Sequence, residues 1–354
     1  MQKFRDKIFN EEVFEKYINT LPSTKENSLI KEGLFTNVNK YKALMSEQTG
    51  GYAVLSPIKG RLGGTPVNYD GNTNIPKGAE RDTFYQRKIC YGRAQSWGEY
   101  DFSADITGTN FQAEAQEVKD YWDEQRQTTV LSILTGIFGM TGGANGNFVT
   151  KHTYDITSQT VATLGADTMN KAAQQALGDK KAKFDISFMH SFVSTNLEGL
   201  NLINFLKYTD DKGIERDLTI GTFNGKLVIV DDEMPTQEVA ETSEGAGDGY
   251  TAYTTYVFQK GFFEYENIGL VTNKAIELAR DPYDKGGKTD LISRIREMVV
   301  PYLISYKGTG TVSPTNDNFA TGSNWELANN DKTGTAKVYV DDKLIPVARI
   351  ISKG

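Results

Sequence analysis

The spacing of apolar residues along this chain changes from segment to segment, and each spacing predicts a different element. The strongest helical pattern covers residues 110–139, where Phe111, Ala115, Val118 and Trp122 are separated by four, three and four positions. A second apolar stripe continues to the end of the segment. A continuous helix of this length measures about 45 Å at a rise of 1.5 Å per residue. We therefore expect a rigid strut about as long as a domain is wide.

Two short helices are predicted near the start of the sequence. Asn10 is a suitable cap for a helix over residues 11–18, which ends before Pro22. Ser23 and Glu26 form the Ser-x-x-Glu capping box of a second helix, and Gly33 supplies the left-handed residue that ends it.

The remaining segments mix strand and helix patterns. Residues 184–188 alternate like a strand before helical spacing begins after Ser191, and Asn224-Gly225 predicts a type I′ hairpin turn. Further predictions are a loop over residues 142–147, a helical segment over 157–183, a polar loop over 238–254, β structure over 253–266, and a terminal strand or hairpin. Because no regular βαβ alternation exists, the pattern favours an α+β fold.

One long segment, residues 50–108, has neither a helical period nor enough large apolar residues to bury itself. Ten of the 34 glycines fall in it, together with short β-type pieces and the turn signal Asp70-Gly71. Its aromatic residues argue against the alternative of a disordered linker. Long irregular excursions are uncommon in compact chains and are usually functional, so we expect this segment to lie on another surface.

Composition excludes several classes of function. The 354 residues are 38% hydrophobic, enough for a real core, and the net charge of −7 gives no reason to expect a nucleic-acid groove or an anionic membrane partner. One cysteine and two histidines exclude an internal disulfide and a thiolate or imidazole metal cage. The charged start and the absence of a bilayer-length apolar run indicate a soluble protein made in the cytosol.

The candidate chemical sites are weak, and we predict no catalytic, cofactor-binding or metal-binding residues. Asp231, Asp232 and Glu233 follow an apolar strand and precede a proline, which is typical of a turn. The segment starting at Asp70 lacks the sixth-position glycine and the closing glutamate of a calcium loop. His190 lacks the surroundings of a catalytic triad and is interpreted as a structural hydrogen-bonding group. No nucleotide-binding glycine motif occurs.

Several stretches occur in an order and spacing that resemble the major capsid proteins of tailed bacteriophages, which have the Hong Kong 97-type fold. They include GGYAVLSPIKGRLGG, FMHSFVSTNL, IGTFNGKLVIVDDEMP, KTDLISRIREMVVPYLISYKG and SPTNDNFATGSNWEL. The resemblance covers the chain from about residue 5 to residue 330. No single motif decides it, but the ordered set is specific.

The resemblance implies a domain organisation. Residues 1–49 correspond to an N-terminal arm, 50–108 to the extended loop that reaches over a neighbouring subunit, and 109–154 to the peripheral domain with its spine helix. Residues 155–300 correspond to the axial domain, and 301–354 return to the peripheral domain.

The same resemblance implies a function and partners. The subunit would self-assemble as pentamers and hexamers into the icosahedral capsid of a virion, made in the cytoplasm of the bacterial host. It would enclose double-stranded DNA without sequence-specific contact, alongside a portal protein and a separate scaffolding protein, and without a membrane. No cross-linking motif is matched. An encapsulin-like shell protein or another virion component is the alternative. An enzyme is the third choice, because the sequence contains no recognisable catalytic site.

In a shell of like-charged subunits, basic residues must face carboxylates across each contact. The extended loop supplies the candidates for these contacts, which are Arg61, Tyr69, Asp70, Arg81, Arg87 and Arg93.

Overall fold

The structure is a computed structural model that describes residues 33–42, 45, 52–75, 81–101, 115–209, 215–240, 249–270, 275–308 and 311–354. The two short helices predicted before residue 33 lie outside the described residues. Gly33 itself has a φ of 76°, the left-handed conformation that was expected of it.

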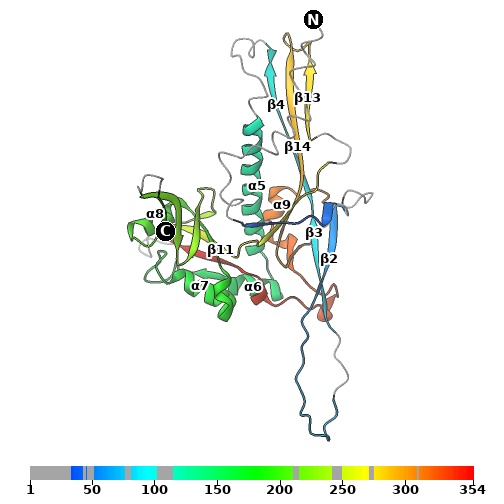
Figure 1. Cartoon of the computed structure of the whole chain (residues 1–354), viewed down its shortest axis with the longest axis vertical. Helices are drawn as coiled ribbons and strands as arrows, with labels where there is room; N and C mark the ends of the chain where they lie inside the picture. Colours follow the sequence, from blue (N-terminus) through cyan, green and yellow to red (C-terminus); the bar gives the residue numbers. More distant parts are fainter. Residues whose placement is uncertain are drawn as a thin grey trace.

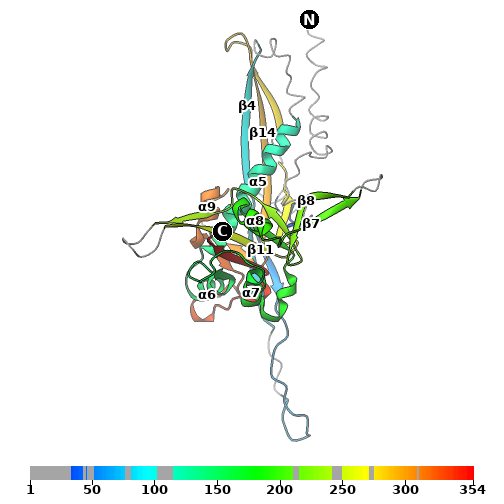
Figure 2. The same ribbon diagram turned by 90° about the vertical axis from the view of Figure 1, so that its left-hand side faces the viewer.

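The molecule is elongated, with a compact body between two projections (Figure 1). At one end stand β4 (Tyr91–Tyr100), β13 (Ile276–Asp281) and β14 (Lys288–Pro301). At the other end hangs the loop that joins β2 (Ala53–Lys59) to β3 (Thr83–Ile89). A lobe with α6, α7, α8 and β11 lies beside the long axis in Figure 1 and in front of it in the view turned by 90° (Figure 2).

A five-stranded sheet forms the long axis, and β14 is its central strand. β14 pairs antiparallel with β4 through ten residue pairs along one edge. Along its other edge it pairs antiparallel with β13 and with β12 (Phe263–Asn267). β1 (Phe35–Asn37) adds to β12 in parallel. β4 therefore belongs to this sheet, which corrects the expectation that the whole of residues 50–108 lacks burial in its own chain.

The predicted strut is confirmed as α5 (Ala115–Phe138) for the described part of the segment. Near its start, Val118 and Trp122 pack against Ile276 and Leu291 of the long sheet. Its second half enters the largest core, where four side chains are completely buried: Val130, Ile133, Leu134 and Ile137. The helix thus runs from the projecting sheet into the body, and its sequence pattern reflects burial along both halves.

The side lobe contains an eight-stranded mixed sheet. Its strand order is β5-β17-β11-β6-β9-β8-β7, with β10 paired to β11. The bounds are β5 (Thr153–Asp155), β6 (Ile186–Met189), β7 (Asn204–Thr209), β8 (Glu215–Phe223), β9 (Lys226–Val230), β10 (Thr236–Val239), β11 (Tyr250–Phe258) and β17 (Val347–Ser352). Helices α7 (Thr168–Leu177) and α8 (Ser191–Gly199) contribute Met169, Leu177, Val193 and Leu197 to its second core.

Short elements complete the body and the side lobe. They are α6 (Gly143–His152), α9 (Asn316–Ala320), β15 (Ile304–Tyr306), β16 (Trp325–Leu327), and the 3-10 turns η3 (Gly178–Lys183), η4 (Gly322–Asn324), η5 (Gly334–Ala336) and η6 (Asp342–Leu344). The α+β class is confirmed.

Several local predictions are confirmed. Asn224 and Gly225 have φ values of 50° and 72°, as a type I′ turn requires, and they join β8 to β9. The strand before His190 and the helix after it are β6 and α8. The terminal strand is β17.

One local prediction was wrong, and two were only partly right. Residues 143–147 begin helix α6, because the positive φ of Gly142 and Gly143 leads into a helix whose Phe148 is buried. The side chain of Asn145 also accepts a hydrogen bond from the backbone of Leu327 at 3.0 Å. The predicted helical segment over 157–183 is confirmed only in α7 and η3, and the two ends of the predicted polar loop belong to strands β10 and β11. In α6, tertiary contacts overrode local composition.

Candidate functional site

The loop between β2 and β3 is the most exposed part of the described chain. Every residue from 61 to 75 is exposed. The loop carries large apolar side chains with no cover, including Leu62 at 79% exposure, Ile75 at 72% and Tyr69 at 91%. Isolated exposed apolar residues are ordinary, but several on one projecting segment mark an interaction surface.

The tip of this loop is ordered by Asp70. Its carboxylate accepts hydrogen bonds from the backbone N–H groups of Asn72 at 2.9 Å and Thr73 at 2.7 Å, and from the Thr73 hydroxyl at 3.0 Å. These bonds lower the pKa of Asp70 from 3.8 to about 2. Gly71 follows with a φ of 78°. The tip is a closed turn that holds Tyr69 outward.

The six candidate contact residues fall into two groups. Arg61, Tyr69, Asp70 and Arg81 are exposed along the loop and at its return. Arg87 and Arg93 are half-buried in β3 and β4. The guanidinium of Arg93 donates to Asn316 Oδ1 at 3.1 Å and lies 4.8 Å from the ring centre of Tyr91. Four of the six therefore lie together in the projecting loop, and Arg93 is engaged within its own chain.

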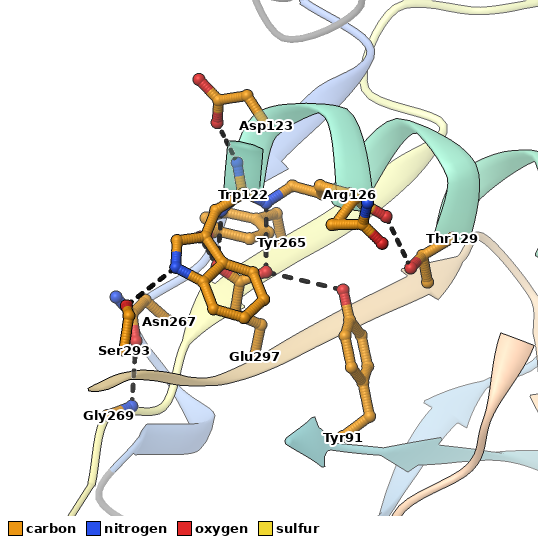
Figure 3. Close-up of polar contacts among 11 residues, drawn as sticks. Tyr91, Trp122, Asp123, Arg126, Thr129, Tyr265, Asn267, Gly269, Ser293 and Glu297 are labelled. Carbon is orange, nitrogen blue, oxygen red and sulfur yellow. Dashed lines mark hydrogen bonds and ion pairs between the residues drawn. The ribbon is translucent and has the colours of Figure 1, made fainter. Parts of the chain in front are cut away.

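A polar network joins α5 to the long sheet at the centre of the molecule (Figure 3). Arg126 donates from Nη2 to Glu297 Oε1 at 2.6 Å and from Nε to Glu297 Oε2 at 3.1 Å. It also donates to Asp123 Oδ1 at 2.5 Å and lies over the ring of Tyr265. The Glu297 side chain is only 2% exposed. This forked pair fixes the position of the helix across two strands.

Two tyrosines complete the network. Tyr265 donates its hydroxyl to Glu297 Oε1 at 2.9 Å, and Tyr91 approaches Glu297 Oε2 at 3.5 Å. Burial, followed by the negative charge of Glu297, raises the pKa of both tyrosines above 10. Burial alone would lower the pKa of Arg126, but Glu297 raises it above its ordinary value. Arg126 therefore stays charged and the two tyrosines stay neutral.

The turn after β9 also contacts α5. Asp231 Oδ1 accepts the backbone N–H of Glu233 at 2.8 Å, and Gln127 of α5 donates to Asp231 Oδ2. The hydroxyl of Thr128 donates to Glu233 at 3.1 Å. The turn interpretation of this acidic stretch is confirmed. His190 likewise has the structural role expected of it, because its Nδ1 accepts the backbone N–H of Phe192 at 3.1 Å.

Within the described ranges, no group of three or more histidine, cysteine, aspartate or glutamate side chains is placed to hold a metal ion. No helix among the same residues is both long and apolar enough to cross a bilayer. Cys90 is a free, buried cysteine.

This arrangement is similar to that of two solved phage capsid structures. The chain matches the capsid asymmetric unit of cyanophage Pam1 with a TM-score of 0.54 and 10% sequence identity, over 94% of this chain and 93% of that one. It matches the capsid of Ralstonia phage GP4 with a TM-score of 0.51 and 12% identity, over 80% and 89% of the two chains.

The chain has the fold of a phage capsid protein. At the level of the fold, this confirms the Hong Kong 97-type expectation. The sequence itself matches no protein-family model and no curated protein. Within this capsid fold, the projecting β2–β3 loop and the α5–sheet network are the two features that the geometry singles out.

The sequence drew attention to the loop but not to the network. Turn residues and scattered aromatics marked the loop, because both signals are local. Arg126 and Glu297 are 171 positions apart and carry no local signature. The one hint was Arg126 three residues after Asp123 on the strongest helix, a spacing that allows an ion pair.

Proposed function

We propose that this protein is the structural subunit of the icosahedral capsid of a tailed bacteriophage, and that many copies assemble into a shell that encloses double-stranded DNA. The fold similarity to phage capsids supports this proposal. The observation that carries it is the β2–β3 loop, where every residue from 61 to 75 is exposed and the large apolar side chains include Leu62, Tyr69 and Ile75. Such a segment gains burial when a second copy covers it.

In this proposal the loop lies on a neighbouring copy in pentamers and hexamers. Heterologous contacts of this kind produce closed rings of subunits. Each contact is modest in strength, but a shell contains many of them. The bonds to Asp70 hold the tip in one shape before contact, which lowers the entropy lost on association. Arg61 and Arg81 face acidic groups of the neighbour, and Arg87 and Arg93 adjoin the same contact.

The remaining assignments belong to the same proposal. Residues 1–49 form the N-terminal arm, 50–108 the extended loop, 109–154 the peripheral domain, 155–300 the axial domain, and 301–354 return to the peripheral domain. A separate scaffolding protein and a portal protein assist assembly in the host cytoplasm. The subunit acts by contact and performs no catalysis.

Negative-stain microscopy of the purified protein, expressed with and without its neighbouring genes, tests this function. The wild type is expected to form closed shells of uniform size. Tyr69→Ser combined with Leu62→Ser should reduce shell yield at least tenfold while the circular dichroism spectrum stays that of the wild type. Tyr302→Ser, at a half-exposed tyrosine of the body, is the matched control and should assemble normally. A wild type that stays monomeric under all these conditions would contradict the proposal.

Asp70→Ala and Arg81→Ala probe the loop separately. The first removes the carboxylate that closes the tip, and the second removes a charge without altering the tip. Both should lower shell yield and leave the subunit folded. Unchanged yield for both variants would show that the loop does not form the contact.

A further inference from the structure

A cluster of lysines lies on the side lobe, away from the loop and from the α5–sheet network. It forms where three elements meet at Asp185. The backbone of Asp185 bonds to Leu227 of β9 at 2.9 Å and to Phe258 of β11 at 3.0 Å, and its carboxylate accepts the backbone N–H of Lys260 at 3.2 Å. The lysines of the cluster are Lys180, Lys181 and Lys183 of η3, Lys226 of β9, and Lys260 after β11.

One member of the cluster is buried with little compensation. Lys226 is 6% exposed, and its only hydrogen-bond acceptor among the described residues is the backbone carbonyl of Asn224, at a long 3.4 Å. Burial lowers the pKa of Lys226, and the like charge of Lys181 lowers it further, whereas Asp185 acts in the opposite direction. The positive charge that the cluster presents to solvent therefore comes from its exposed lysines and not from Lys226.

The cluster is basic on an acidic chain. Its five lysines stand against two aspartates, Asp179 and Asp185, so the local net charge is +3 while the chain carries −7. Lys181, Lys183 and Lys260 are exposed. The cluster is therefore a local exception to the charge of the molecule, and it favours an anionic partner.

The chemistry of the cluster favours phosphate groups over a folded acidic protein. Ammonium groups act as point charges and bind phosphates without the planar recognition that arginine provides. A protein interface needs an apolar centre, and none of the exposed large hydrophobic residues of the described chain lies in η3 or at the β8–β9 and β11–β12 turns. No aromatic side chain is exposed there to stack on a base.

We propose that this lysine cluster contacts the phosphate backbone of duplex DNA without reading its sequence. The inference rests on the proposed function, because it assigns one surface of the same subunit to the enclosed DNA. Such contacts release counterions, and each one adds about 0.9 to the slope of log affinity against log salt.

Fluorescence anisotropy of a labelled 30-base-pair duplex with the full-length protein tests the inference across a range of salt concentrations. The variant Lys181→Gln/Lys183→Gln/Lys260→Gln should lower the affinity at least tenfold at low salt. Its salt slope should fall by about 2 to 3, since three contacts are lost. The control Lys307→Gln/Lys332→Gln/Lys343→Gln removes the same charge from exposed lysines elsewhere and should keep the wild-type slope. Arginine at the three cluster positions should also keep it.

Three results would overturn the inference. Equal slopes for the cluster variant and the wild type would do so, and so would equal losses in the cluster variant and the control. The third result is a cluster variant that binds the duplex as well as the wild type does but loses affinity for polyglutamate, while the control variant keeps it. That result would identify an acidic polypeptide as the partner. Particle formation is scored in parallel. Normal shells with an unchanged slope would refute only the DNA contact, whereas a wild type without shells would refute the proposed function.

Discussion

The ion pair of Arg126 and Glu297 is the clearest case in which one residue determines the position of an element. Both side chains are removed from water, and removing two charges from water costs more free energy than a single attraction returns unless further hydrogen bonds compensate. Here Tyr265 and Asp123 supply those bonds. The pair therefore contributes chiefly to orientation, because it is satisfied in only one arrangement of α5 on the sheet.

Arg126→Met should lower the free energy of unfolding by about 3 to 5 kcal/mol, because it leaves the Glu297 carboxylate buried without its partner. Urea denaturation of the isolated subunit measures the loss. The double variant Arg126→Met/Glu297→Met should recover most of it. A single-variant loss below about 1 kcal/mol would mean that water reaches Glu297 and the network is not essential.

We expect the free energy of unfolding to depend on pH through His152. It is 1% exposed, its Nδ1 donates to the Val347 carbonyl at 2.6 Å, and burial lowers its pKa below the ordinary 6.5. Below pH 6.5 the imidazole of His152 binds a proton in the unfolded chain, whereas in the folded chain it stays neutral down to a lower pH. The contribution of neutral His152 to the free energy of unfolding is therefore fully present above pH 6.5. It decreases as pH falls from 6.5 toward the lower pKa of the folded state, by no more than about 1.4 kcal/mol per pH unit.

Unfolding free energies measured between pH 7.5 and 5 check this expectation. His152→Asn removes the titrating ring and should flatten the dependence over that range, although it lowers stability at every pH. An identical slope in the variant and the wild type would assign the pH dependence to other groups.

At the scale of elements, the close approach of α5 to α9 and η4 depends on glycine. A Cβ atom at Gly136 would collide with the Phe319 carbonyl and the Trp325 ring, and one at Gly322 would collide with the backbone of Gly139. The C-terminal end of α5 therefore contacts α9 and η4 backbone to backbone. Beside this contact, the ring N–H of Trp325 donates to the Phe319 carbonyl at 2.6 Å.

Gly136→Ala should destabilise the subunit by about 1 to 3 kcal/mol, because the overpacking exceeds the gain in helix propensity of about 1 kcal/mol. Gly146→Ala in α6 is the matched control. An added Cβ there meets only atoms at 3.7 Å or more, so this variant should be neutral or slightly more stable. Thermal unfolding of both proteins compares them, and equal behaviour would refute the steric account.

The sequence predicted elements where the signal is local and failed where distant contacts decide. The period of α5, the Asn224-Gly225 turn and the strand-to-helix change at His190 were all readable, because each depends on neighbours in the chain. Helix α6 was missed because Gly142, Gly143 and Gly146 suggest a loop, while burial of Phe148 and the bond from Leu327 to Asn145 stabilise a helix. Of the candidate site, sequence reasoning located the loop but not the role of Asp70 in closing its tip.

At the scale of the whole molecule, the projecting loop is separate from the fold that carries it. Residues 61–75 bury no side chain, whereas the base of the hairpin is held by the seven pairs of β2 with β3 and by the bond from Tyr85 to Asn329 at 2.7 Å. The loop therefore adds surface for contact and little to stability.

Removing residues 62–74 should change the free energy of unfolding by less than about 1 kcal/mol, since these residues bury no side chain and a shorter loop alters the closure entropy only slightly. Shell formation should be abolished. Denaturation and microscopy of the same preparation test both statements. A large loss of stability would show that the loop supports its own subunit.

The antiparallel pairing of β4 and β14 also decides how the molecule carries mechanical load. A pull between the loop tip and the β13–β14 turn draws the two strands past each other along their length. Ten residue pairs then resist together, in shear, instead of opening one after another. In the proposed shell, any load along this direction would be borne by the backbone, with little dependence on any one side chain.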